Sequence, residues 1–468
     1  MDTILPSTFW PLLIAFAPCF GGPSFRNFCA VMTGWVHCLG RHTVTAVALA
    51  SGDLERRHVS TFHRFFACAQ WTLDSLGIVI YRLAERWTEA DQPLRAGLDD
   101  TLARKTGKCI SLASMHHDPL LSPSARRPFA SFGHVWVILC VWLPLPFTQQ
   151  RGVSLPVLFR LYVGKKRGGQ ADSPSRRTSG KRLAAARAAA EAELKREVTK
   201  LNLGREMIDL LASWAGDRQV VVAMDSAYAG RAMLEKLPDN VAIISRLRMD
   251  AALWTPPPAR RPGQKGRPRR RGERLPSPSL WAAARRGWHR LTLILYGRPV
   301  SSQVFTKTAL WYVALREHPV RIVIVRDPTG RRRDEAFFCT DVQASAAYIL
   351  QTYASRWCLE VAFRDGKQHL GFEDPQQQVE LAVRRTAPLA FIVYDLVWLW
   401  QADLHHAGQA IGWVPRPWYR QKVAVSFADL LTALRHERWS TAFFDPPCDS
   451  RWRKNSPATW THDVLATA

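Results

Sequence analysis

Apolar residues recur along the chain with two different periods, and the change of period divides the chain into regions. In residues 1–90 they recur at helical spacing, over residues 24–37, 43–49 and 60–87, with Gly-containing breaks between the runs. This spacing predicts an N-terminal helical domain over residues 1–90. Basic residues gather within it, so a DNA-binding module is one interpretation and a plain helical packing domain is the other.

Beyond residue 90 the apolar runs become short and β-branched, which is typical of buried strands. A basic Gly/Ser-rich loop (165–182) and a long Ala/Glu/Lys-rich helix (183–215) separate the third run from the fourth. Three strands followed by helix, strand, helix and strand predict an α/β fold with a mixed sheet, and we assign residues 91–254 to the first part of this core. The predicted strands occupy residues 94–99, 135–143, 153–163, 220–225 and 241–247.

Residues 255–287 interrupt this pattern, because Pro, Gly and Arg replace the apolar residues and cannot form a packed core. The segment is either a solvated linker or a basic arm that lies along DNA. We favour the arm, with Arg269, Arg270 and Arg271 as candidate DNA contacts. A β-rich insertion follows, and together with the linker it spans residues 255–342. Its predicted strands are residues 290–296, 308–315, 321–326 and 336–340.

The remaining chain returns to helical spacing. Residues 343–405 are predicted to hold the second part of the core, with a helix around Glu360 and an apolar helix at 386–400. The apolar helix contains Asp395 and is too short to span a bilayer, so no membrane segment is predicted. Residues 406–468 form a C-terminal region whose expected role is dimerisation.

The composition indicates a polyanionic partner. Lys and Arg number 64 against 39 Asp and Glu, a formal net charge of +25 over 468 residues, and nucleic acid is the commonest partner of so basic a chain. A ribosome and an acidic membrane surface are the alternatives. The nine Cys include no C-x-x-C pair, which argues against a zinc ribbon and a disulfide framework. No signal peptide is predicted, because residues 4–20 lack a basic flank, and the expected location is the cytoplasm, with nucleoid association when DNA is bound.

The most informative pattern is Y-x2-R-x3-E-x6-K, formed by Tyr353, Arg356, Glu360 and Lys367. At about 100° per residue these side chains fall within a helical stripe about 60° wide. A phenol, a guanidinium, a carboxylate and an ammonium on one face suit a metal-bound phosphodiester, because the carboxylate can hold the metal and the cations can hold phosphate. The alternative for Glu360 is a solvated ion-pair ladder with Arg356 and Arg364, four residues to either side.

Two other segments supply partner carboxylates. The apolar run 220–224 ends at Asp225, as expected of a buried strand that delivers a carboxylate at the carboxyl edge of an α/β sheet. The second segment is Asp99-Asp100-Thr101. The alternatives are a helix cap for Asp225 and turn chemistry for Asp99 and Asp100. Together with Glu360, the aspartates predict a two-metal carboxylate site.

This constellation resembles the DDE transposases of bacterial insertion sequences, specifically the cut-and-paste branch that carries the Y-R-E-K signature. The signature is matched in full. Asp99-Asp100-Thr101 resembles the D-x-T segment of that branch, which favours Asp99 over Asp100 as the first catalytic carboxylate. Asp225-Ser226-x-Tyr228 resembles the second Asp segment. The resemblance implies a ribonuclease-H-like core, in agreement with the predicted order of strands.

The resemblance further implies metal-dependent cleavage at transposon ends and strand transfer into target DNA. Asp99, Asp225 and Glu360 would hold two Mg²⁺ ions, for which Mn²⁺ can substitute, and a homodimer would hold double-stranded DNA in a synaptic complex. The alternatives are a ribonuclease-H-like nuclease without strand transfer and a domesticated, non-catalytic DNA-binding descendant. The predicted DNA-binding residues are Tyr353, Arg356 and Lys367 of the stripe, Arg246 and Arg248 of the strand after Asp225, and Arg269, Arg270 and Arg271.

Overall fold

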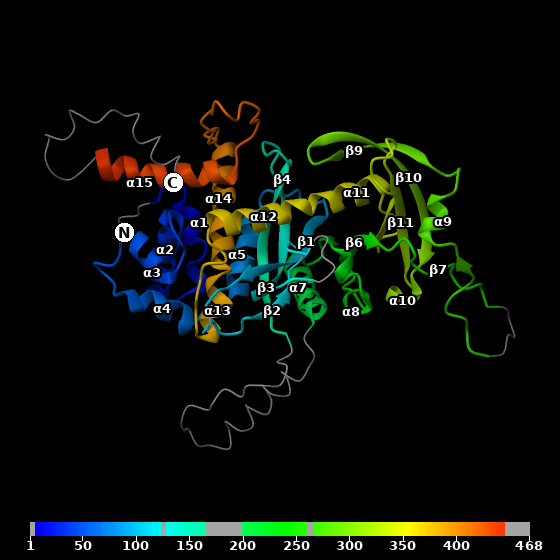
Figure 1. Ribbon diagram of the computed structural model, residues 1–468, viewed down its shortest axis with the longest axis horizontal. Helices are drawn as coiled ribbons and strands as arrows, with labels where there is room; N and C mark the ends of the chain where they lie inside the picture. The colour runs from blue at the N-terminus through cyan, green and yellow to red at the C-terminus, as the bar shows by residue number, and fades with distance from the viewer. Residues whose placement is uncertain are drawn as a thin grey trace, which may run out of the picture.

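The computed structural model describes residues 5–107, 109–118, 120–122, 128–164, 199–260 and 266–444. Figure 1 shows a helical end, which combines N-terminal and C-terminal helices, and a long sheet that extends away from it. The predicted loop 165–182 and the first part of the predicted helix 183–215 lie outside the described residues. The remainder of that helix is α7 (Lys200–Ala215).

Five strands form the core of the sheet, in the order β4-β3-β1-β5-β6. β1 pairs antiparallel with β3, and β3 with β4, whereas β5 and β6 run parallel to β1. Three antiparallel strands followed by two strands parallel to the first is a ribonuclease-H-like arrangement, so the predicted mixed sheet is confirmed. The bounds are β1 (Leu94–Arg104), β3 (Ala130–Pro144), β4 (Gly152–Tyr162), β5 (Val220–Met224) and β6 (Val241–Leu247), and a short β2 (Ser114–His117) pairs with the start of β3.

The insertion extends the same sheet. Its strand β12 (Glu335–Cys339) pairs antiparallel with the core strand β6, and β11 (Pro319–Arg326) and β10 (Arg298–Leu310) continue outward. β9 (His289–Leu295) pairs with β10 in a hairpin that arches back toward the centre of the molecule (Figure 1). The insertion also contains β7 (Leu253–Trp254), β8 (Arg274–Leu275), α9 (Pro278–Ala282) and α10 (Tyr312–Leu315).

Three predictions for the insertion are wrong in detail. Residues 308–315 are not one strand, because β10 ends at Leu310 and a helical turn follows; an apolar run of this length fits either structure. The turn expected at residues 297–299 lies at Tyr296 and Gly297, whose positive φ values of 53° and 76° suit a tight hairpin. The segment predicted to be unpacked ends in α9, which buries Trp281.

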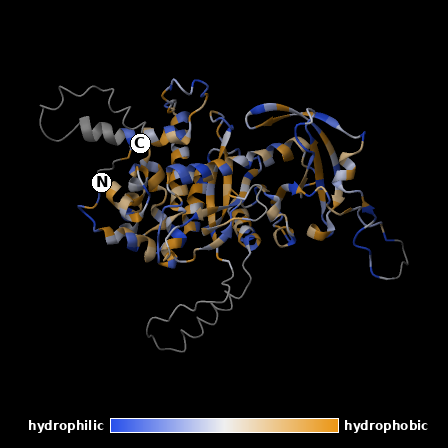
Figure 2. Ribbon diagram, in the orientation of Figure 1, coloured by the Kyte–Doolittle hydropathy of each residue, from blue (hydrophilic) through white to orange (hydrophobic). Residues whose placement is uncertain are grey.

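The N-terminal helices are α1 (Trp10–Ile14), α2 (Gly22–His37), α3 (Val44–Ala50), α4 (Val59–Ala67) and α5 (Leu73–Glu85), with a 3-10 turn at Ala17–Cys19. Their buried side chains belong to the same hydrophobic cluster as those of the core strands. The C-terminal helices α13 (Glu380–Thr386), α14 (Leu389–His406) and α15 (Phe427–Phe444) lie beside them (Figure 1). In this contact the Trp35 indole Nε1 donates to the Leu370 carbonyl oxygen at 2.9 Å. Figure 2 shows hydrophobic residues concentrated on the strands and the inner helix faces.

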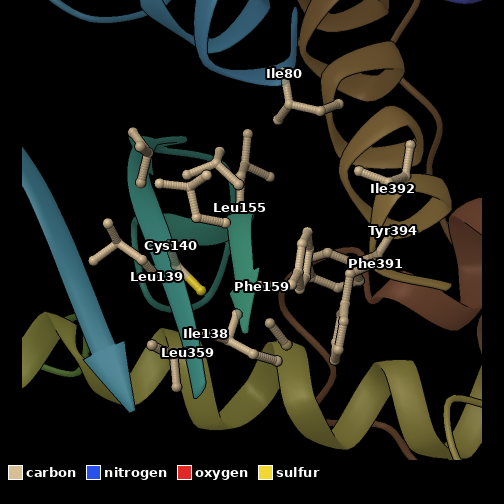
Figure 3. Packing of buried hydrophobic residues seen from close by; sticks show 14 of the residues in the cluster. Ile80, Ile138, Leu139, Cys140, Leu155, Phe159, Leu359, Phe391, Ile392 and Tyr394 are labelled. Carbon is tan, nitrogen blue, oxygen red and sulfur yellow. The ribbon is translucent and has the colours of Figure 1, made fainter. Parts of the chain in front are cut away.

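The helix predicted around Glu360 is divided at Arg356 into α11 (Ala346–Ser355) and α12 (Trp357–His369). Arg356 keeps helical angles (φ −54°, ψ −29°), so the helical path continues through it. Gly366 lies within α12 because α14 approaches closely there: a Cβ at this position would stand 2.5 Å from Cε1 of Phe391. Figure 3 shows this layer, with Leu359 of α12 under β3 and Phe391 of α14 beside Phe159 of β4. α12 is thus held between the sheet and α14.

α14 is the apolar helix that was predicted at residues 386–400. It is buried over most of its length, and Asp395 is completely inaccessible at its centre. No helix within the described residues is long and apolar enough to cross a membrane.

Candidate functional site

The strand β1 presents two adjacent aspartates to opposite faces of the sheet. Successive side chains of a strand alternate between its faces. Asp99 faces α12, where its Oδ2 accepts a hydrogen bond from Nη1 of Arg356 at 2.6 Å. Asp100 faces α7 and accepts from the Tyr228 hydroxyl at 2.8 Å and from Lys200 Nζ at 2.7 Å. The structure therefore brings Asp99, and not Asp100, to the helix of Glu360. The predicted strand 94–99 was too short, and turn chemistry for the two aspartates is wrong, since both lie within β1.

Arg356 joins two carboxylates from distant parts of the chain. Its Nη1 binds Asp99, and its Nη2 donates to Oε1 of Glu360 at 2.9 Å. The Arg356 side chain is 14% exposed, so this interaction is screened far less than a surface ion pair. Arg364 pairs instead with Asp365 at 2.8 Å. Of the predicted ladder, only the pair of Glu360 with Arg356 is formed, and Arg356 is mostly buried and not solvated.

Asp225 follows β5 directly, at the carboxyl end of the strand parallel to β1. Its side chain makes no capping hydrogen bond to the 3-10 turn that follows, and the next helix, α8 (Arg231–Leu234), has Gly230 as its N-cap residue, so the helix-cap interpretation is wrong. The negative charge of Asp225 contributes to the raised pKa values of Asp99 and Tyr353, as expected when these groups are close together.

Burial raises the pKa of Asp99 to about 7, and the positive charge of Arg356 opposes this shift only in part. Asp225 and Asp100 raise it further by repulsion. A carboxylate in this position is stabilised by any cation that approaches it. In the structure Arg356 supplies that positive charge.

The donor set suits a hard divalent cation such as Mg²⁺, because Asp99, Asp225 and Glu360 offer carboxylate oxygens. Across the described ranges, no three His, Cys, Asp or Glu side chains are placed to hold one ion. The reason at this site is that Arg356 lies between Asp99 and Glu360. The chemistry of the residues fits a metal, and the guanidinium would have to leave before an ion could contact both carboxylates.

The other residues of the stripe lie on the same helical path. Tyr353 packs its ring on Phe337, with centroids 4.8 Å apart, and burial raises the pKa of its phenol. Lys367 lies in the last turn of α12, where its Nζ donates to the Leu102 carbonyl oxygen at 2.7 Å and is 3.3 Å from Glu373 Oε1. Lys367 therefore contacts β1 beyond the aspartates and does not contact the carboxylates of the site.

The remaining predicted DNA contacts lie on the insertion side of the sheet. Arg246 of β6 pairs with Glu335 of β12, and Arg248 pairs with Asp250 at 2.7 Å. In the basic segment, Arg269 is exposed and Arg270 lies 3.4 Å from Glu317. Arg271 stacks over the rings of Trp254 and Tyr312, at 4.5 and 5.1 Å from the centroids. None of the five contacts Asp99, Asp225 or Glu360 in the described structure.

Lys200 was not predicted as a partner of Asp100. The two residues are 100 positions apart, and no local pattern connects the first residue of α7 with β1. Tyr228 was visible in the Asp225-Ser226-x-Tyr228 segment, but its hydrogen bond to Asp100 depends on the path of the chain after β5.

The sequence model of a family described as DDE superfamily endonuclease matches residues 15–296, a range that includes β1 and β5 but not α12. No curated protein matches the chain. Among solved structures, the chain is similar to a cryo-EM structure of a piggyBac transposase synaptic complex with hairpin DNA, at 10% identity and a TM-score of 0.38, over 95% of this chain and 75% of that one. Because the family match covers more than half of the sequence, the chain belongs to the DDE superfamily endonucleases.

Proposed function

We propose that this protein is a DNA transposase of the cut-and-paste branch found in bacterial insertion sequences, which cleaves transposon ends and joins them to target DNA. The observation that carries the proposal is the meeting of Asp99 and Glu360 at one guanidinium, with Asp225 at the end of the neighbouring parallel strand. Membership of the DDE superfamily endonucleases supports an activity on DNA.

In this proposal Asp99, Asp225 and Glu360 hold the divalent ions, Mg²⁺ by their oxygen chemistry. Bound ions would supply activation of the attacking hydroxyl and stabilisation of the leaving oxygen. The role of Arg356 is to neutralise the carboxylates in the free protein and to bind a DNA phosphate when DNA is present. A guanidinium is suited to both, because its planar fork matches carboxylate and phosphate oxygens alike.

The other predicted DNA contacts would bind the DNA at different places. Tyr353 and Lys367 would orient the strand near the scissile phosphate from α11 and α12. Arg246 and Arg248 would contact the backbone beyond the site. Arg269 is exposed and available to bind a DNA phosphate. Arg270 and Arg271 would also bind phosphate, which would compete with Glu317 for Arg270 and with the Trp254 ring for Arg271. We propose a homodimer as the form that holds two DNA ends.

The test is cleavage of a DNA that carries the sequences flanking the coding region. Glu360→Gln should abolish cleavage, because a hard metal site loses an anionic ligand, while binding to the same DNA stays within about twofold. Glu380→Gln is the matched control, since Glu380 is exposed on α13 and pairs with Arg384 of the same helix, away from the site. Full cleavage by the Glu360→Gln protein would refute the assignment. Cleavage without joining to a target plasmid would indicate a nuclease in place of a transposase.

A further inference from the structure

A basic pocket lies on the same face of the sheet as Asp99, near the first residues of β1. It has a volume of about 210 Å³ and is enclosed by the β3–β4 turn, the tip of the β9–β10 hairpin and α11. Arg95 enters it from β1 and Arg151 from the β3–β4 turn. Arg95 and Asp99 share a face because they are four residues apart on one strand, a separation of about 13 Å. Gly97, between them, faces Leu359 and Arg356.

The pocket is lined by cations and contains no carboxylate. The guanidinium of Arg95 stacks over the Trp142 ring, 3.4 Å from its centroid, and burial lowers its pKa. Among the ion pairs of the described residues, neither Arg95 nor Arg151 takes part. An anion that enters this pocket would be attracted by both guanidiniums, and no carboxylate of the lining competes with it.

Two glutamines add further donors. Oε1 of Gln150 accepts a hydrogen bond from the Cys358 thiol at 2.9 Å, and Oε1 of Gln351 accepts from the backbone N–H of Ile294 at 2.9 Å. Because the oxygen of each amide is engaged, each side chain has its NH₂ group left for a ligand. The pocket thus offers guanidinium and amide donors, which is the chemistry that binds an oxyanion.

The backbone around the pocket is held in one arrangement. Arg151 has a φ of 59°, a conformation that costs a non-glycine residue about 1–2 kcal/mol. Gly297 at the hairpin tip lies so close to the β3–β4 turn that a Cβ would stand 2.4 Å from the Gln149 carbonyl oxygen. The two turns therefore abut each other, and the side chain of Arg151 is placed at the pocket in spite of its unfavourable backbone.

We infer that this pocket binds a phosphate group, and that its source is the DNA backbone at a point away from the cleaved bond. The identity of the source rests on the proposed function; the preference for an oxyanion rests on the pocket alone. A strand that lies across Asp99 extends along the same face of the sheet, and about 13 Å corresponds to about four nucleotides of axial rise. The pocket would hold the DNA in register with the catalytic carboxylates.

Arg151→Gly is the sharpest test, because it removes a cation and also relieves the backbone. Its melting temperature should equal or exceed that of the wild type, while its affinity for a random 30-base-pair duplex should fall about eightfold at 0.1 M salt, with the slope of log affinity against log salt lower by about 0.9. Gln351→Glu keeps the bond to Ile294 but replaces the donor by an anion, so it should weaken binding at least as much. Arg82→Ala is the control for charge, since Arg82 is exposed on α5 and does not line the pocket.

The arms of the experiment separate the two sources of phosphate. The melting temperature of each protein is also measured in about 10 mM inorganic phosphate and in chloride of the same ionic strength. A phosphate concentration of this order fills even a weak site. Loss of DNA affinity in both pocket variants supports the backbone phosphate. Unchanged DNA affinity with a phosphate-induced stabilisation seen only in the wild type would identify a small phosphorylated molecule and overturn the DNA source. Pocket variants that match the wild type in both arms would overturn the inference, whereas a wild type that neither binds nor cleaves DNA would refute the proposed function instead.

Discussion

Replacing Asp99 by asparagine should stabilise the fold at alkaline pH and abolish cleavage. The carboxyl of Asp99 has an ordinary pKa of 3.8 in the unfolded chain and a pKa of about 7 in the folded protein, mainly because of burial. An acid whose folded pKa is raised binds its proton more tightly in the folded state. Its presence therefore costs nothing below about pH 4, and the free energy of unfolding falls as the pH rises toward 7.

The size of the effect follows from that difference. At 1.36 kcal/mol per pKa unit, ionising Asp99 in the fold costs about 4 kcal/mol by pH 8. Asparagine does not ionise, and its Oδ1 can still accept the hydrogen bond from Nη1 of Arg356. The pKa of about 7 already includes the attraction of Arg356, so no further correction is made for this bond. The expectation is a stabilisation of up to about 4 kcal/mol at pH 8 that is absent near pH 4.

Urea denaturation in EDTA at pH 5 and at pH 8 measures this directly. The wild type should lose stability relative to the Asp99→Asn protein between the two pH values. Asp100→Asn is the matched control: Asp100 accepts from the Tyr228 hydroxyl and from Lys200, so its loss should destabilise the fold at both pH values by about 1 kcal/mol. Identical pH dependence of the wild type and the Asp99→Asn protein would show that Asp99 is not a buried, cation-requiring carboxylate.

Two further predictions concern the helices behind the site. Gly366→Ala gains about 1 kcal/mol of helix propensity but places a Cβ 2.5 Å from Phe391. Urea unfolding should therefore show a net loss of stability of about 1 kcal/mol or more, and cleavage should fall. Increased stability would contradict the close approach of α12 and α14. Burial raises the pKa of Asp395 well above its ordinary value, and its carboxyl has no hydrogen-bond partner within the described residues. The Asp395→Asn protein should therefore be more stable than the wild type by about 1–3 kcal/mol above neutral pH, and this difference should disappear in acid. An equal pH dependence of the two proteins in thermal melts would refute this second expectation.

The local features of the site were predictable because they depend on nearest neighbours in the sequence. The run Val220–Met224 is apolar throughout, which predicts a strand covered on both faces, and that strand ends at Asp225 as expected. The spacing of Tyr353, Arg356, Glu360 and Lys367 predicts one helical stripe, and it survives the division at Arg356 because that residue keeps helical angles.

Other features needed the tertiary structure. Apolar periodicity stops being informative at Asp99, so the strand was predicted to end there, whereas pairing with β3 carries β1 on to Arg104. Residues 308–315 are apolar enough for a strand or a helical turn, and the path of the chain after Leu310 decides between them. Sequence patterns indicate which side chains are buried, but they do not indicate how far pairing with a neighbouring strand extends a strand.

The sequence by itself determined the types of groups at the site: strand carboxylates, with Asp225 at the end of a buried strand, and a helix with a polar face in a strongly basic chain. Only the tertiary structure decided that Asp99 faces Glu360 while Asp100 faces Lys200, because strand alternation fixes opposite faces but not which helix covers each. It likewise decided that Arg356 occupies the space between Asp99 and Glu360. The contact of Arg356 with Asp99 joins residues 257 positions apart, and its geometry is set by the packing of α12 between the sheet and α14.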